Sequence, residues 1–212
     1  MKIVFFGESP ADEAALRVFT EGILGEPPEP VVGMNLEGHG VTGVLRALSG
    51  IFRGVYYHSD AEGLVVAVDG DDTEMHDPNH DSPAGSSENC RLCQIRKIIV
   101  QARKYLTVCP NRGELRVAIG VAVPAIEAWY LVGREHQVGE AAWRVGVEAN
   151  QRPFTRLELK ELVYGTTRPS LEQEKECAVR EARRLIGNIG IIETAFPMGF
   201  GLMAAEIRSW KS

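Results

Sequence analysis

The chain has 212 residues, of which 44% are hydrophobic, and this is enough to build one domain around a sizeable core. Its formal net charge of −6 argues against a uniform coat of non-specific nucleic-acid contacts. No stretch reaches the roughly 18 apolar residues that span a bilayer, and the apolar run over 3–6 is too short for a signal peptide. We therefore expect a cytoplasmic protein with no membrane association.

The first third of the chain alternates strand and helix patterns. Ser9 and Asp12 have the spacing of a capping box, and Pro10 suits the first position of a helix. In chain order we expect a strand over 2–6, a helix from residue 10, a strand over 31–34, a helix over 40–51, a short strand over 54–57 and a buried strand over 64–68. This βαβ alternation predicts an α/β fold with a mostly parallel sheet flanked by helices.

The rest of the chain begins with a long polar segment and becomes helical toward its end. Residues 72–89 are too many for a simple turn, and connections of that length usually carry function or are disordered. The later expected elements are a helix over 91–106, a strand over 115–123, and helices over 124–132, 155–164, 170–186 and 197–210. The prediction is a single domain over 1–212, with an insertion over 72–110 and a helical extension over 133–212.

Asp69-Gly70-Asp71-Asp72 follows the buried strand directly and ends it in a group of carboxylates. In open α/β sheets this carboxyl edge is where ligands bind, and clusters of oxygen ligands suit Mg²⁺ or Mn²⁺. Glu8 follows the first strand, so it meets Asp69 and Asp71 if the two strands are neighbours. The alternative is a solvated acidic turn.

A second group of metal-binding side chains lies in and after the long polar segment. His76 and His80 precede Cys90 and Cys93, and two histidines with a Cys-x2-Cys pair suit tetrahedral Zn²⁺. A zinc ion would hold the segment rigid beside the acidic residues. Cys109 is an alternative ligand in place of one histidine, and a mobile loop with incidental thiols is the alternative to a zinc site.

Charge is distributed unevenly along the chain. Residues 58–81 contain eight acids and no Lys or Arg, whereas residues 91–116 contain seven bases and one acid. A basic stripe beside an acidic metal site is what an enzyme acting on a polyanion needs, and the alternative is a solvated helix face. The expected nucleic-acid contacts in this stripe are Arg91, Arg96, Lys97, Arg103 and Lys104.

Several segments together resemble the TOPRIM fold, which occurs in topoisomerases, bacterial primases, small RNA-maturing nucleases and OLD-family nucleases. Residues 6–13, Phe-Gly-Glu-Ser-Pro-Ala-Asp-Glu, resemble a Glu-Gly-x-Thr-Asp-Glu opening, although Gly precedes the Glu and Ser-Pro replaces Gly-x. Residues 65–72 resemble the acidic strand, and residues 123–131 closely resemble a Pro-x-Ile-Glu-Ala-Trp-Leu-Leu segment. Residues 196–200, Phe-Pro-Met-Gly-Phe, are similar to the family's ending. The nearest pattern is that of an uncharacterised bacterial TOPRIM-like family, associated with anti-phage and mobile-element loci.

The resemblance implies a TOPRIM-like nuclease that uses Mg²⁺ or Mn²⁺ to cleave phosphodiesters in nucleic acid. The metal-binding and catalytic residues that it implies are Glu8, Asp69 and Asp71, with Glu127 as a further acid at the same edge. Asp72, the last carboxylate of the 69–72 group, is expected as an additional metal ligand. For Glu127 the alternative role is a carboxylate that the dipole of its helix favours. Lys160 would face the phosphate, or else is an exposed helical lysine.

Two other functions stay open at this point. Asp69-Gly70-Asp71-Asp72-Thr73 fits the Asp-x-Asp-x-Thr motif of haloacid-dehalogenase-like phosphatases, whose first Asp is a covalent nucleophile, although that motif normally follows the first strand. The other alternative is a non-catalytic binding or effector subunit of an ATPase partner. The chain has no Gly-x4-Gly-Lys-Ser/Thr loop of its own, which leaves room for such a partner.

Overall fold

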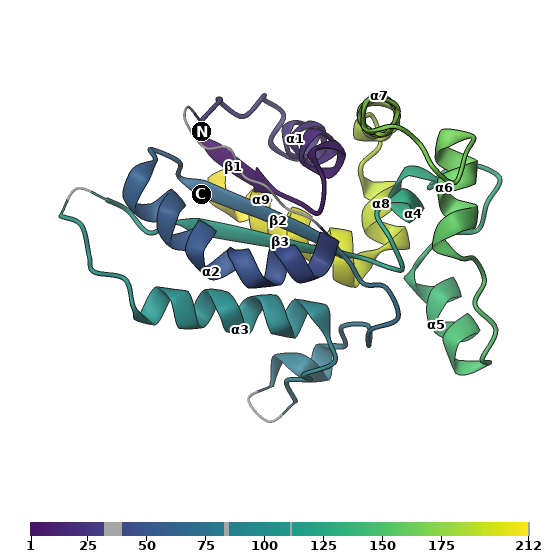
Figure 1. Ribbon diagram of the computed structural model, residues 1–212, viewed down its shortest axis with the longest axis horizontal. Coiled ribbons are helices and arrows are strands. Elements are labelled where there is room, and N and C mark those ends of the chain that lie inside the picture. The colour runs from purple at the N-terminus through teal and green to yellow at the C-terminus, as the bar shows by residue number, and fades with distance from the viewer. Residues whose placement is uncertain (32–39, 83–84, 111, 212) are drawn as a thin grey trace.

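The computed structural model describes residues 1–31, 40–82, 85–110 and 112–211 (Figure 1). Three strands form one parallel sheet in the order β1 (Ile3–Phe6), β2 (Gly63–Asp69), β3 (Arg116–Ala122). The α-helices are α1 (Pro10–Leu24), α2 (Gly40–His58), α3 (Arg91–Lys104), α4 (Glu127–Tyr130), α5 (Glu140–Glu148), α6 (Arg156–Tyr164), α7 (Leu171–Ile186), α8 (Gly190–Ala195) and α9 (Leu202–Arg208). Among the described residues, no helix combines the length and the apolar character that a bilayer crossing requires.

Helices cover both faces of the sheet, which explains why its strands are apolar on both sides. On one face, α2 and α3 pack against Leu64, Val66 and Val68 of the central strand. On the other face, Val65 and Ala67 join a larger core with α1 and α9, and α7 packs on α1 (Figure 1). The predicted α/β fold with a parallel sheet is therefore confirmed.

Helix α9, from the segment expected as a helical extension, packs directly on the sheet. Met203, Ala204 and Ile207 are buried in the core shared with β1 and β2. A Cβ at Gly120 of β3 would lie 2.9 Å from the Met203 sulfur, so glycine at this position allows the close approach of α9. The end of the chain thereby completes one layer of the fold.

Three local predictions need correction. The strand expected over 54–57 is the last part of α2, because Phe52 and Val55 continue the buried stripe of Val44 and Leu48 at helical spacing. The helix expected over 124–132 is limited to α4, because the backbone before it bonds to the turn after β2 instead of to a longer helix. The helix expected over 197–210 begins with a π-helical turn, Pro197–Gly201. In addition, the structure contains helices α5 and α8, which the sequence patterns do not predict. The strand expected over 31–34 lies outside the described residues except at Val31.

Candidate metal centres at the sheet edge

Glu8 and Asp69 follow neighbouring parallel strands and meet at the carboxyl edge of the sheet. Phe6 pairs with Val66, so β1 ends beside the second half of β2. The backbone N–H of Asp69 donates to Glu8 Oε1 at 2.7 Å. The sequence-based expectation that these two acids converge is met by a direct hydrogen bond.

The turn after β2 is held by the backbone that follows β3. The N–H of Gly70 donates to the carbonyl of Ala122 at 2.6 Å, and the N–H of Asp71 donates to the carbonyl of Pro124 at 2.8 Å. A Cβ at Gly70 would lie 2.8 Å from the Val123 side chain, which explains glycine between the two acids. Asp71 has φ 49°, a left-handed conformation that Asp adopts more readily than most residues.

Glu127 opens α4 and is buried, with 4% of its surface exposed. Asp69 Oδ1 accepts a hydrogen bond from the N–H of Ile126 at 2.9 Å, which places the start of α4 against the turn. Among the described residues, Glu127 Oε2 has no hydrogen-bond partner, and Lys160 Nζ lies 3.9 Å from Oε1. A buried carboxylate oxygen without a donor is unfavourable, and a bound cation would satisfy it. We call Glu8, Asp69, Asp71 and Glu127 the acidic edge.

Burial raises the pKa values of three of the four acids in the acidic edge. It is the largest cause for Glu8, Asp69 and Glu127, and the charges of Glu8 and Glu127 raise the pKa of Asp69 further. Asp12, in the first turn of α1, has its pKa raised to about 7 by burial and by the charges of Glu127 and Glu8. A site in which several carboxylates are unfavourable as anions is a site that a cation stabilises.

Arg156 reaches the acidic edge from the first position of α6, and sequence reasoning did not single it out. Its Nη2 lies 2.5 Å from Asp69 Oδ2, and its Nη1 pairs with Asp71 Oδ1. Partial burial lowers the pKa of Arg156, but Asp69 and Asp71 outweigh this and raise it. One guanidinium therefore bridges two of the carboxylates expected to bind metal.

Asp72 and Lys160 have other partners than those expected. The Asp72 carboxylate is exposed and lies 2.8 Å from Arg152 Nη2, and no contact brings it to the acidic edge within the described residues. Lys160 is half-buried beside the acidic edge. Its Nζ lies 3.3 Å from Glu174 Oε1 and 3.9 Å from Glu127 Oε1. The structure thus brings together four of the five acids expected at the site.

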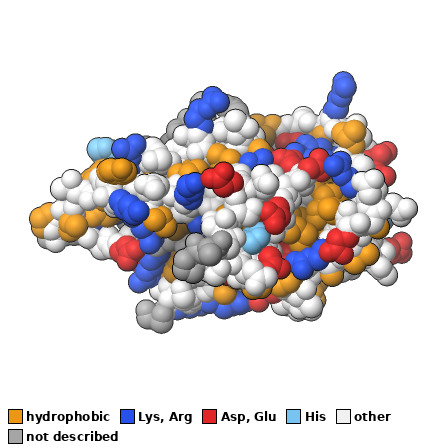
Figure 2. All heavy atoms as spheres, turned by 90° about the horizontal axis from the view of Figure 1, so that it is seen from below, with side chains coloured by type: hydrophobic (Ala, Val, Ile, Leu, Met, Phe, Trp, Pro, Cys, Tyr) orange, Lys and Arg blue, Asp and Glu red, His pale blue; other side chains and the backbone are white. Residues whose placement is uncertain are grey.

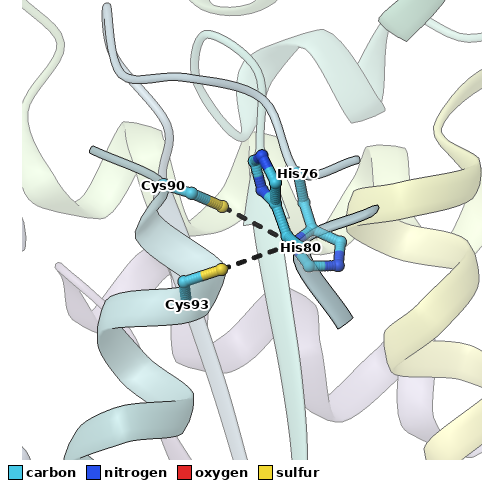
Figure 3. Close-up of side chains that lie close together, drawn as sticks. All are labelled: His76, His80, Cys90 and Cys93. Atoms are coloured by element: carbon cyan, nitrogen blue, oxygen red, sulfur yellow. Dashed lines mark hydrogen bonds between the residues drawn. The ribbon is translucent and has the colours of Figure 1, made fainter. Parts of the chain in front are cut away.

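His76, His80, Cys90 and Cys93 form a second cluster, in which one ligand atom from each residue lies within 4.8 Å of all the others. Figure 3 shows both sulfurs directed at the same nitrogen of His76, with the His80 ring beside it. The His76 Nδ1 to Sγ distances are 3.5 Å for Cys90 and 3.8 Å for Cys93. Nitrogen and sulfur ligands of one tetrahedral Zn²⁺ are separated by about 3.5 Å, so the spacing fits. We call these four residues the thiol–imidazole cluster.

The surroundings of the thiol–imidazole cluster suit metal ligands. His76 Nε2, on the ring side away from the sulfurs, lies 3.2 Å from Asp81 Oδ1, as in the carboxylate–histidine pairs that orient metal-binding imidazoles. Burial, and then the charge of Arg96, lowers the pKa of His76, which keeps the imidazole neutral. Burial raises the pKa of the Cys90 thiol to about 11, so a bound cation is what would stabilise its thiolate. The cluster has the donor set and spacing to hold a metal ion, which suggests zinc.

Cys109 is not part of the thiol–imidazole cluster. It follows α3, whereas Cys90 and Cys93 lie at the start of that helix, and its backbone N–H donates to the Tyr56 hydroxyl. The candidate metal ligands are therefore the two histidines and the Cys-x2-Cys pair.

The basic residues of α3 are largely paired with acids of the same chain. Arg96 lies 2.5 Å from Asp81, Lys97 lies 3.4 Å from Glu88, and Arg103 lies 2.9 Å from Glu114. Arg91 donates to Gln94, and Lys104 is exposed. Figure 2 shows the face of the molecule on the side of α3. Lys and Arg side chains are spread over the half of this face that α2 and α3 form, and they are mixed with acids over the other half. These ion pairs reduce the charge that α3 offers to a polyanion.

A cleft of about 970 Å³ lies between the connection that follows β2 and the α5 region. Residues from Asp72 to His80 line one side, and residues from Trp143 to Arg152 line the other. The cleft therefore borders the turn of the acidic edge at one end and the thiol–imidazole cluster at the other.

Comparisons with known proteins give no match to a family model, to a curated protein or to a solved structure. Function is therefore inferred from the geometry and chemistry of the two centres.

Proposed function

We propose that the chain is a Mg²⁺- or Mn²⁺-dependent nuclease whose cation binds at the acidic edge, and that a zinc ion in the thiol–imidazole cluster holds the neighbouring connection. The observation that supports the acidic-edge proposal most is the buried Glu127 Oε2, which has no hydrogen-bond partner among the described residues and belongs to a carboxylate whose charge acts on Asp69. The TOPRIM resemblance over the same residues agrees with this assignment.

The residues of the acidic edge suit the hydrolysis of a phosphodiester. A divalent cation, when bound, polarises a phosphoryl oxygen and lowers the pKa of a water molecule. Glu8 follows β1, Asp69 ends β2 and Asp71 lies in the turn after it, so different backbone segments bring these acids to one edge of the sheet. Glu127, which lies deeper, offers Oε2 as a proton acceptor at the same edge.

The test is cleavage of labelled single- and double-stranded DNA and RNA with Mg²⁺ or Mn²⁺. The Asp69→Asn variant removes one charge and keeps the Oδ1 acceptor for Ile126, so the turn is preserved. We expect a loss of activity of about 100-fold or more, as for removal of a group that stabilises the transition state. The control is Asp60→Asn, which changes an exposed acid that is paired with Lys2 before the opposite end of β2.

The alternative outcomes are also informative. Cleavage by Asp69→Asn at the wild-type rate contradicts the assignment to this site. Absence of cleavage with all four substrates, together with a gel shift by the wild-type protein, favours a non-catalytic binding subunit of an ATPase partner. Trapping of an aspartyl-phosphate analogue on Asp69 would favour the phosphatase alternative.

A further inference from the structure

Arg156 occupies the position between Asp69 and Asp71 that a divalent cation needs. The two guanidinium nitrogens each pair with a different carboxylate, and the side chain of Asp69 is only 9% exposed. A cation bound to both carboxylates would meet the positive guanidinium at the same oxygens. Arg156 and a divalent cation therefore compete for these ligands.

The position of Arg156 in the chain shows that this contact is not incidental. Arg156 is the first residue of α6, after the cap Thr155, and a positive charge at a helix N-terminus is unfavourable. Its side chain is 43% exposed and Asp71 lies on a turn, so the guanidinium can move outward without opening the core. Glu127, whose buried Oε2 has no partner within the part of the chain that the structure describes, remains inside the site when Arg156 moves.

We propose that Arg156 is an internal counter-ion of the acidic edge, which leaves Asp69 and Asp71 when the divalent cation binds and then contacts the phosphate of the substrate. This inference rests on the proposed cation site of the acidic edge, and its second part rests on the proposed nuclease activity as well. A guanidinium presents paired N–H donors that match phosphate oxygens, and its new position would be next to the cation. Arg156 thus neutralises Asp69 and Asp71 in the cation-free protein and binds a phosphate of the substrate in the cation-bound protein.

The experiment compares Mn²⁺ binding by calorimetry in the wild type, Arg156→Gln and Arg152→Gln. Loss of the competing guanidinium is expected to raise Mn²⁺ affinity on the order of tenfold in Arg156→Gln, corresponding to the loss of a partly buried ion pair. Arg152 is the matched control, since it comes from the same segment and pairs with Asp72 outside the acidic edge. Its variant should change the affinity by less than about twofold.

Cleavage assays on the same variants separate this inference from the nuclease proposal. If the chain is a nuclease, Arg156→Gln should bind Mn²⁺ more tightly yet show a higher KM for nucleic acid. Arg156→Lys should reverse less than half of this increase in KM, because lysine lacks the paired N–H donors. Tighter Mn²⁺ binding without any cleavage would support the counter-ion role and overturn the nuclease. Unchanged or weaker Mn²⁺ binding in a folded Arg156→Gln protein overturns the counter-ion role, whatever its activity.

Discussion

The acidic edge and the thiol–imidazole cluster lie at the two ends of one connection, yet the protein holds them in different ways. Asp69 and Glu8 are fixed by backbone hydrogen bonds at the ends of paired strands. His76 and Cys90, in contrast, lie on a connection that bonds mainly to itself, through the isolated bridge between Glu74 and Cys90 and the 3-10 turn Pro78–Asp81. The strand ends fix the first centre, whereas a metal ion bound in the second would add a link across its own connection.

This difference predicts opposite responses to the loss of ligands. The carboxylates of the acidic edge repel one another in a buried position, so removal of one is expected to increase the stability of the cation-free protein. In the thiol–imidazole cluster, a bound metal ion would stabilise the connection that carries its ligands. Removal of the ligands is therefore expected to destabilise that connection. Mutations at the two centres should therefore shift stability in opposite directions.

The largest expected effect follows from Cys90→Ser with Cys93→Ser. The double variant should lose its zinc and several kcal/mol of stability, because the free energy of binding a structural zinc is part of the folding free energy. Elemental analysis and urea unfolding measure the two losses. Hydrogen exchange should show lost protection over 74–90 and retained protection in β2. A zinc-selective chelator applied to the wild type should give the same pattern.

Cys109→Ser is the control for this prediction, because Cys109 lies outside the thiol–imidazole cluster. It should retain the zinc and the wild-type stability. A double Cys90/Cys93 variant as stable as the wild type, or a wild type without zinc, would show that the cluster is an ordinary part of the core.

The next effect has the opposite sign. Glu127→Gln should raise the stability of the cation-free protein at pH 8 by about 1 kcal/mol, because it removes a buried carboxylate that carries an unpartnered oxygen. The same variant should bind Mn²⁺ more weakly. Urea unfolding and calorimetry provide the two measurements. Glu174→Gln, which removes the other carboxylate beside Lys160, should change stability by less than about 0.5 kcal/mol. A clear loss of stability in Glu127→Gln would place this residue among ordinary structural acids.

The third expected effect is a pH dependence that comes from a carboxyl group near the acidic edge. Glu13 accepts a hydrogen bond from the backbone of Gly7, next to Glu8, and burial raises its pKa from 4.5 to about 7. The folded state therefore holds the proton more tightly than the unfolded chain. This contribution to stability is complete below about pH 4.5 and is lost as the pH rises through about 7.

Glu13→Gln removes this dependence. Relative to the wild type, the variant should gain about 1–2 kcal/mol of stability between pH 5 and pH 8, after allowance for the partial exposure of Glu13. Urea unfolding at four pH values measures the difference. Glu26→Gln, a change at an exposed carboxylate, should show a constant difference from the wild type. A constant difference for Glu13→Gln too would contradict the assigned burial effect.

Sequence reasoning found the residues whose neighbours are determined locally or by strand pairing. The His76–Cys93 spacing lies within one connection, and Glu8 and Asp69 each follow an apolar strand. Arg156 was missed because it contacts Asp69 from 87 positions away, and nothing in its own helix indicates that partner. Tertiary contacts also explain the missed helix α5, whose buried Glu140 accepts from the N–H groups of Met198 and Gly199.

The position of α9 on the sheet has a consequence for synthesis of the protein. The buried residues of the face covered by α2 and α3 all precede residue 123. The strands and the helices that cover this face are therefore synthesised before residues 123–212 of the chain. The opposite face waits for Met203 and Ile207, which belong to the same core as Ile3. During translation α1 can already cover β1 on this face, but the side of β3 that α9 contacts stays exposed until residues 202–210 are synthesised, and this is the surface on which a chaperone would act.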